Sequence, residues 1–267
     1  MSLQPAETSG VSSAIMRAKG QLNSHNRRLG SGLRLNSASD DAAASAIVAQ
    51  MSARLASLNQ ATRNVSDGQS VLAVADQAMG EQAGILTRMR ELAVQSSNGT
   101  LSDSDRSAIA EEFGALRVEL DRISAASEFN GQTVLDGTSF SIMVGAETGQ
   151  TVSVGGVDVD SAALGVDGSS VGSQSAAQAA LAELDGAIDT LSSARGTIGA
   201  QYSRLDLADQ LVSASATAMA SSRSRIADAS IGREAAGQHQ SLLQLRSAIA
   251  VQGRAMETRG LLLDLLA

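Results

Sequence analysis

Apolar residues recur at every seventh position along two long segments of the chain. The first repeat, between residues 42 and 95, consists of Met51, Leu58, Val65, Leu72, Met79, Leu86 and Ala93. The second repeat, in the other half of the chain, consists of Leu184, Leu191, Ile198, Leu205, Val212, Met219 and Ile226. A strict period of seven keeps one side of a helix against a partner helix. The pattern therefore predicts two long helices that pack on each other as an antiparallel helical rod.

Small and apolar residues between the repeated positions support this prediction. Ala61, Gly68 and Ala75 lie three residues after members of the first repeat, so we expect a neighbouring helix to approach closely there. The second repeat is expected to be reinforced by three further side chains, Leu181, Ile188 and Tyr202.

A third, shorter helix is predicted from about Ser104 to Ala126. Ser102, Asp103 and Ser104 offer side-chain oxygens for an N-cap. Apolar residues then follow at spacings of three and four, namely Ile109, Phe113, Leu116, Leu120 and Ile123. We expect this helix to lie on the rod.

Residues 130–170 change from helical to alternating character. Short alternating runs at residues 140–144 and 151–154 are separated by turn dipeptides such as Asn130-Gly131 and Asp136-Gly137. This pattern predicts one or two β-hairpins.

The two ends of the chain carry separate amphipathic stripes. The N-terminal stripe consists of Val11, Ile15, Ala18, Leu22 and Leu29, and the C-terminal stripe of Leu242, Leu245, Ile249, Met256, Leu263 and Leu266. The pattern alone leaves two interpretations open, because the stripes either cover each other within one chain or are buried further by assembly. Two helices of this length make a small core, which favours assembly and predicts mobile ends in the monomer.

Composition fits a helical rod better than an ordinary globular interior. Aromatic residues make up 1% of the 267 residues, and the one proline is Pro5. The absence of cysteine excludes disulfides, thiolate metal sites and a cysteine nucleophile. We find no apolar run long enough to span a membrane and no cleavable secretory signal, so export is expected to use another route.

Charge is unevenly distributed along the chain. The formal net charge is −8, which argues against nucleic acid as the main partner. Residues 1–34 and 233–267 together carry +5, and the middle of the chain carries −13. This division suggests two regions with different roles.

Four stretches resemble bacterial flagellins in order and spacing. They are RLGSGLRLNSASDDAA at residues 28–43, RELAVQSSNGT at 90–100, FNGQ with LDG at 129–137, and SRIADA at 224–229 followed by Glu234, Gln240, Gln244 and Gln252. The resemblance covers essentially the whole chain. It implies a mainly α fold in which a long antiparallel coiled-coil rod carries a small β-hairpin region and is accompanied by paired terminal helices.

The resemblance also implies a domain organisation. Residues 1–35 and 228–267 would each contribute a helix to the inner layer of a filament, and residues 36–227 would form the rod domain of the next layer. Residues 138–175 occupy the place where many flagellins insert large outer domains. The chain is therefore similar to a minimal flagellin that lacks them.

By resemblance, the function is that of a structural subunit that polymerises through its terminal helices into the extracellular flagellar filament for motility. The assembly interface would comprise Val11, Ile15, Leu22, Leu29, Leu242, Leu245, Ile249, Met256, Leu263 and Leu266. The implied partners are further copies of the chain, hook-associated and cap proteins, an export chaperone and the flagellar export apparatus. Arg88, Leu92 and Glu119 resemble a surface that innate immune receptors detect in some flagellins and that would also be an inter-subunit contact.

The segment after the first helix is predicted to connect the two layers. Gly30 and Gly32 would let the chain change direction, and Asn36, Asp40 and Asp41 would supply turn and cap hydrogen bonds. For Arg34, pairing with acids of adjacent subunits and simple solvation both remain open.

The sequence offers no candidate for catalysis or cofactor binding. The Gly30-Ser31-Gly32 segment lacks the lysine and further glycine of a phosphate-binding loop. His25 and His239, on the two terminal helices, have no supporting acid or thiol at metal-ligand spacing and are interpreted as partly buried polar residues. Paired carboxylates such as Asp40-Asp41 are interpreted as caps. We therefore expect no enzyme activity, cofactor or metal.

Two alternative functions remain open at this point. A flagellar hook-associated junction protein would share similar terminal helices but would cap one end of a filament. A signalling coiled coil would explain the heptads but not the hairpin region or the basic ends.

Overall fold

The computed structural model describes residues 6–264, and in that range the fold is mainly α-helical. The helices are α1 (Ala6–Ser31), α2 (Ala42–Ser96), α3 (Asp103–Ala126), α4 (Gln174–Ala227) and α5 (Ile231–Asp264). The strands are β1 (Glu128–Phe129), β2 (Gln132–Thr133), β3 (Ser139–Met143) and β4 (Thr151–Gly155). None of the described helices is long and apolar enough to cross a membrane.

The chain divides into two compact units. One unit, here called the terminal unit, contains the described residues up to Leu55 and those from Ala218 onward. The other, here called the rod unit, is Ala56–Thr217. The predicted division into residues 1–35, 36–227 and 228–267 concerns layers of an assembly and stays a prediction.

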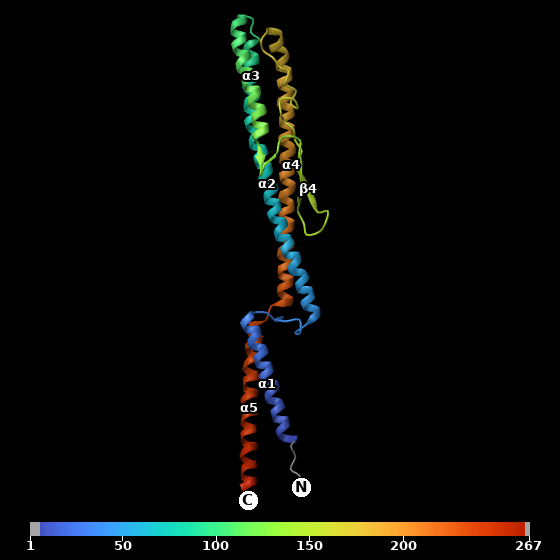
Figure 1. The fold of residues 1–267 in the computed structure, drawn as a ribbon, viewed down its shortest axis with the longest axis vertical. Helices are drawn as coiled ribbons and strands as arrows, with labels where there is room; N and C mark the ends of the chain where they lie inside the picture. The colour runs from blue at the N-terminus through green and yellow to red at the C-terminus, as the bar shows by residue number, and fades with distance from the viewer. Residues whose placement is uncertain (1–5, 265–267) are drawn as a thin grey trace. The chain divides into compact units, whose positions relative to one another are not determined.

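Helices α2 and α4 run antiparallel through the rod unit (Figure 1). Nε of Arg90 lies 2.7 Å from Oδ1 of Asp185, and Nε of Arg195 lies 2.9 Å from Oδ1 of Asp76. From the first ion pair to the second, the residue number falls from 90 to 76 on α2 and rises from 185 to 195 on α4, so the two helices run in opposite directions. The repeated positions from Leu58 to Ala93 and from Leu184 to Val212 are buried. The predicted rod is therefore confirmed.

The predicted close approach of small residues occurs at Gly68. A Cβ placed there would lie 3.0 Å from Cγ1 of Ile142 and 3.1 Å from Cδ1 of Leu205. Ala61 and Ala75 are also buried. The prediction for Tyr202 is wrong, because its side chain is 47% exposed. The heptad spacing places Tyr202 at the edge of the stripe, where the large ring remains in solvent.

Helix α3 begins as its sequence predicts. Ser102 is the N-cap and forms a capping box with Asp105, in which each side chain accepts from the other residue's backbone amide. Phe113, Leu120 and Ile123 are buried against the rod. Arg106 is also buried, and its guanidinium donates to the carbonyls of Ser96, Asn98 and Leu101. These bonds satisfy the last carbonyl of α2 and tie the loop between α2 and α3 to α3.

Two antiparallel hairpins follow α3, as the alternating pattern predicts. Strands β1 and β2 are joined by Asn130-Gly131, whose φ angles of 51° and 77° suit a two-residue hairpin turn. In the second hairpin, Ser139 pairs with Gly155 and Met143 with Thr151. Val152 and Val154 turn toward the core, and the Gln201 side chain of α4 exchanges two hydrogen bonds with the backbone of Gly155.

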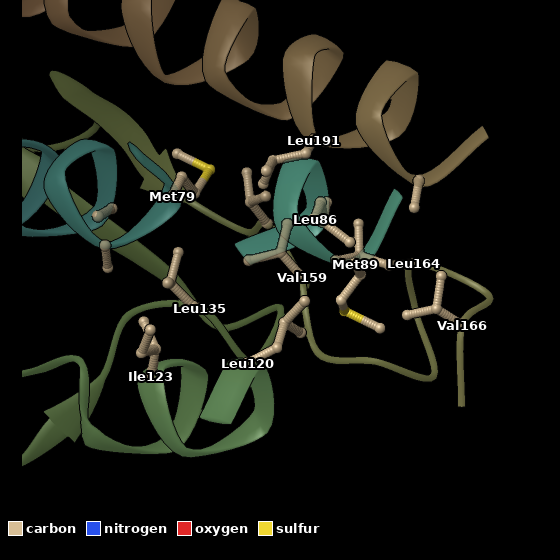
Figure 2. Packing of buried hydrophobic residues seen from close by; sticks show 14 of the residues in the cluster. Met79, Leu86, Met89, Leu120, Ile123, Leu135, Val159, Leu164, Val166 and Leu191 are labelled. Atoms are coloured by element: carbon tan, nitrogen blue, oxygen red, sulfur yellow. The ribbon is translucent and has the colours of Figure 1, made fainter. Parts of the chain in front are cut away.

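The core of the rod unit is completed by the segment between β4 and α4. Val157, Val159, Leu164, Val166 and Val171 are buried in the same cluster as residues of the three helices. Figure 2 shows Val159, Leu164 and Val166 gathered with side chains of α2, α3 and α4. The Gln82 side chain crosses this core and donates to the carbonyls of Leu120 (3.3 Å) and Val159 (3.1 Å). Aliphatic side chains thus fill an interior that holds few aromatic rings.

Candidate functional site

Helices α1 and α5 of the terminal unit lie side by side and run in opposite directions (Figure 1). Their contact is lined by small and medium-sized side chains, with Ala18 and Ser241 buried at its centre. The pairing agrees with the amphipathic stripes at the two ends of the chain, of which the part of α5 around Leu242 and Leu245 is half-buried.

A polar cluster joins the two helices near the connector. Nδ1 of His25 lies 2.6 Å from Oε2 of Glu234, and the Arg28 guanidinium lies 3.6 Å from Oε1 of the same carboxylate. The Asn26 side chain accepts a hydrogen bond of 2.7 Å from Gln238. Since Glu234 is largely shielded from solvent, its carboxylate is a well-defined link between α1 and α5.

The glycine at position 237 makes room for the imidazole of His25. A Cβ at Gly237 would lie 2.5 Å from Cε1 of the ring and 2.9 Å from Nε2. The two helices therefore approach closely at this level. His239, on the same helix, is exposed, so the prediction that both histidines are partly buried is correct for His25 alone.

The structure brings most of the predicted interface residues together within the helix pair. Six of them are half-buried in this pair, namely Val11, Ile15, Leu22, Leu29, Leu242 and Leu245. Ile249 and Met256 are instead 53% and 59% exposed. Leu263 belongs to α5, and Leu266 lies outside the described residues. The role of this set in assembly stays a prediction.

The helix pair leaves many apolar side chains in solvent. Met16 on α1 is 71% exposed, and Leu243 on α5 is 65% exposed. Further exposed apolar residues of α5 are Ile231, Val251 and Leu261. These positions fall outside the main stripes, so the amphipathic pattern of the sequence does not single them out. Their number on two neighbouring helices is typical of a surface that is buried in a complex.

The connector after α1 is tied to the turn between α4 and α5. Gly32 has φ +70°, and its carbonyl accepts from the amide of Ala229 at 2.9 Å. The Arg34 amide donates to the carbonyl of Ala227, and the Arg34 guanidinium donates to that of Ile226 at 2.7 Å. The predicted change of direction occurs at Gly32, whereas Gly30 lies inside α1.

The polar residues of the connector stabilise a turn within it and cap the start of α2. One carboxylate oxygen of Asp40 accepts from the amides of Asn36 (3.0 Å) and Ser37 (2.9 Å), and these bonds lower the pKa of Asp40. Asp41 accepts from the amide of Ala44 at 3.0 Å and so caps the start of α2. The Asn36 side chain donates to the carbonyl of Leu33.

The three residues predicted as a receptor and inter-subunit surface differ in exposure. Arg88 forms ion pairs with Glu112 (2.7 Å) and Glu91 (3.0 Å) on the surface of the rod unit. Glu119 pairs with Arg122, which lowers the pKa of that carboxyl. Leu92 is 1% exposed, so the prediction that it contributes to a surface is wrong. It faces the core because its position in α2 lies beside the heptad stripe.

No group of three or more potential metal ligands occurs among the described residues. Several polar side chains of the terminal unit, among them Glu234, Arg34 and Asp41, connect its segments or cap a helix. The arrangement is therefore suited to holding a helix pair, with an apolar exterior, against further protein.

Two family models match the chain. The model of the bacterial flagellin N-terminal helical region matches residues 6–139, and that of the bacterial flagellin C-terminal helical region matches residues 181–266. A flagellin of Halalkalibacterium halodurans is 36% identical over 211 residues, which is 78% of each chain.

The chain belongs to the bacterial flagellin family. These matches support the role of a structural subunit of the flagellar filament. The chain spans only 37% of the length of a longer flagellin to which it is 40% identical over 206 residues. Its size agrees with a minimal family member.

Solved structures agree with this assignment. The crystal structure of Bacillus cereus flagellin has 31% identity and a TM-score of 0.52, and the match covers 60% of this chain and 94% of that one. A Vibrio parahaemolyticus structure assigned as a flagellar hook-associated protein has a TM-score of 0.60 at 18% identity, covering 71% of this chain and all of that one. At that identity the second likeness shows the fold alone. The fold of this chain is therefore similar both to a flagellin and to that hook-associated structure, and the fold alone does not distinguish the two.

Proposed function

We propose that this flagellin-family chain polymerises through its two terminal helices into the extracellular bacterial flagellar filament. The observation that carries the proposal is the apolar exterior of the α1–α5 pair, including Met16, Leu243 and Leu261. A helix pair with this exterior has little core of its own. Contact with further copies removes that surface from water, which contributes about 25 cal/mol per Å² of apolar area.

The predicted interface residues fit this function in two ways. Val11, Ile15, Leu22, Leu29, Leu242 and Leu245 hold the helix pair together, and Ile249 and Met256 face outward for contact with other copies. Leu263 and Leu266 would extend the contact toward the end of the chain. Different surfaces of the pair then meet in a head-to-tail manner, which generates an open helical filament.

The connector would join the inner layer of the filament to the rod domain. The Gly32 carbonyl accepts from the amide of Ala229, and Arg34 donates to the carbonyls of Ala227 and Ile226, so these bonds hold the connector against the end of α4 and the α4–α5 turn. Asp40 accepts from the amide of Asn36 within the connector, and Asp41 caps the start of α2. In this proposal residues 1–35 and 228–267 form the inner filament domain, and residues 36–227 form the rod domain of the next layer.

Family membership suggests further partners for the proposed subunit. These are the hook-associated and cap proteins at the filament ends, an export chaperone, and the flagellar export apparatus. Arg88 and Glu119, without Leu92, remain as a surface for an innate immune receptor or a neighbouring subunit. The proposed role is structural and involves no catalysis, cofactor, nucleic acid or membrane.

The main alternative is a hook-associated junction protein, whose few copies cap a filament. Electron microscopy of the purified full-length chain after seeding with short filament fragments tests the difference. Growth of long uniform filaments whose mass increases with added chain supports the filament subunit. Binding to the fragment ends that stops after one layer supports the junction protein.

A further inference from the structure

A basic pocket of about 490 Å³ lies in the terminal unit, beside the connector. Its wall is formed by Arg34 of the connector, Arg225 at the end of α4, and Arg233 in the first turn of α5, together with residues of the α4–α5 turn. Each guanidinium offers five N–H donors in a planar arrangement that matches a carboxylate. Three such groups around one pocket set its chemical preference.

The arginines of the pocket have no acidic partner in the described part of the chain. Arg34 donates to the carbonyl of Ile226, and Arg225 donates to the hydroxyls of Ser221 (3.2 Å) and Ser222 (2.9 Å). For Arg233 we observe neither a hydrogen bond nor an ion pair within residues 6–264. This contrasts with Arg88, Arg90, Arg122 and Arg195 of the rod unit, all of which are paired with carboxylates.

The two acids in the pocket wall are already engaged. Glu234 contacts His25 at 2.6 Å and Arg28 at 3.6 Å, on the side of the α1–α5 pair. Asp228 accepts a hydrogen bond from the hydroxyl of Ser224. Among the described residues no ion pair joins either carboxylate to Arg34, Arg225 or Arg233, so the three guanidinium groups keep donors free for a further carboxylate.

The net charges of the terminal unit and the rod unit indicate which part of a second copy can supply a carboxylate ligand. Residues 1–55 and 218–267 contain 12 basic and seven acidic side chains, which gives +5. Residues 56–217 contain eight basic and 21 acidic side chains, which gives −13. A polymer of this chain brings basic and acidic units of different copies together at high local concentration.

We infer that the basic pocket formed by Arg34, Arg225 and Arg233 binds an Asp or Glu side chain from the rod unit of a second copy. The bound carboxylate accepts charge-assisted hydrogen bonds from the guanidinium groups, with Arg233 as the main donor because it has no other partner. The contact fixes the register between neighbouring subunits. This inference rests on the proposed function, since it requires polymerisation.

The single lysine of the chain, Lys19, makes a direct cross-linking experiment possible. The Arg233→Lys variant keeps the charge and adds one amine at the pocket, which a carbodiimide couples to a carboxylate in direct contact. Filaments are grown from an equal mixture of ¹⁵N-labelled and unlabelled variant, cross-linked and analysed by peptide mass spectrometry. Wild-type filaments, with Lys19 and the terminal amine alone, are the control.

The expected product joins position 233 of one isotopic form to an Asp or Glu between residues 56 and 217 of the other. Cross-links from position 233 that stay within one copy, or reach only acids of the terminal segments, would overturn the inference. The absence of any cross-link at position 233 in intact filaments would do the same.

The Arg233→Gln variant supplies an independent measurement. Its critical concentration for polymerisation is expected to be two- to fivefold higher, a range of about 0.4–1 kcal/mol for a partly exposed ion pair. Arg233→Lys keeps the charge but not the planar donor pair, so its critical concentration should lie between those of the wild type and Arg233→Gln. The difference between Arg233→Gln and the wild type should shrink at 0.5 M NaCl, where the Debye length is about 4 Å. Equal critical concentrations for Arg233→Gln and the wild type would contradict the pocket contact but not the proposed function. A wild-type chain that never polymerises contradicts the proposed function and this inference with it.

Discussion

The carboxylate of Glu234 on α5 links to the imidazole of His25 on α1 across a distance of 2.6 Å. Arg28 approaches the same carboxylate at 3.6 Å, and Gly237 leaves the space that the ring occupies. Helices far apart in sequence are thereby joined next to the connector. The apolar exterior of the pair contributes nothing to its stability until other copies cover it, so this polar link matters most in the monomer.

We predict that Glu234→Ala weakens the pairing of the terminal helices in the monomer. The substitution leaves His25 without its hydrogen-bond partner and Arg28 without its ion-pair partner. The free energy needed to separate α1 from α5 is therefore expected to fall by about 1–2 kcal/mol. Hydrogen exchange of α1 and α5 amides, followed by mass spectrometry, measures this change. Glu257→Ala, at an exposed position of the same helix, is the matched control. Equal exchange rates in the two variants would show that the link is not stabilising.

A second prediction concerns the close contact at Gly68 in the rod unit. Gly68→Leu places a large side chain where even a Cβ lies 3.0 Å from Ile142, so we expect a loss of about 1–3 kcal/mol in unfolding free energy. Gly80→Leu in the same helix has no heavy atom within 4 Å of its Cβ and should gain about 0.5–1 kcal/mol from helix propensity. Urea denaturation of both variants gives the comparison. A similar gain at both positions would contradict the packing of α2 against α4 and the hairpin.

A third prediction concerns pH. Hydrogen bonds from Thr133 and Thr138 lower the pKa of Asp136 from 3.8 to about 2. Because the folded state holds this carboxyl ionised, its contribution to stability is present above about pH 4 and is lost as the pH falls to about 2. Urea unfolding at pH 7, 4, 3 and 2.5 should therefore show a smaller loss of stability for Asp136→Asn than for the wild type. Asp189→Asn, at an exposed position, should follow the wild type. If Asp136→Asn loses as much stability at low pH as the wild type does, the hydrogen bonds to Asp136 are not formed in solution.

The periodic parts of the fold were predictable from the sequence. The stripe of Leu72, Met79 and Leu86 predicted a long buried face, because a heptad repeat has one consistent structural solution. The cap at Ser102 and the Asn130-Gly131 turn depend on local geometry and were likewise readable from a few residues.

Other features depend on contacts between distant segments and were not predictable. The segment that carries Val159 and Leu164 has no period, yet it completes the core because the rod leaves a space that aliphatic side chains fill. Leu92 resembled a surface position by family likeness, and its burial follows from the packing of the core. The pairing of His25 with Glu234 required the relative position of two helices whose charges gave no signal of it.

The central claim is that the terminal helices drive assembly, and a truncation tests it most directly. The full-length chain and a version lacking residues 1–35 and 230–267 are seeded under the same conditions and examined by electron microscopy, with circular dichroism to verify that both are helical. We predict long uniform filaments from the full-length chain and none from the truncated one. Filaments of equal length from both versions, or a full-length chain that stays monomeric when seeded, would contradict the account.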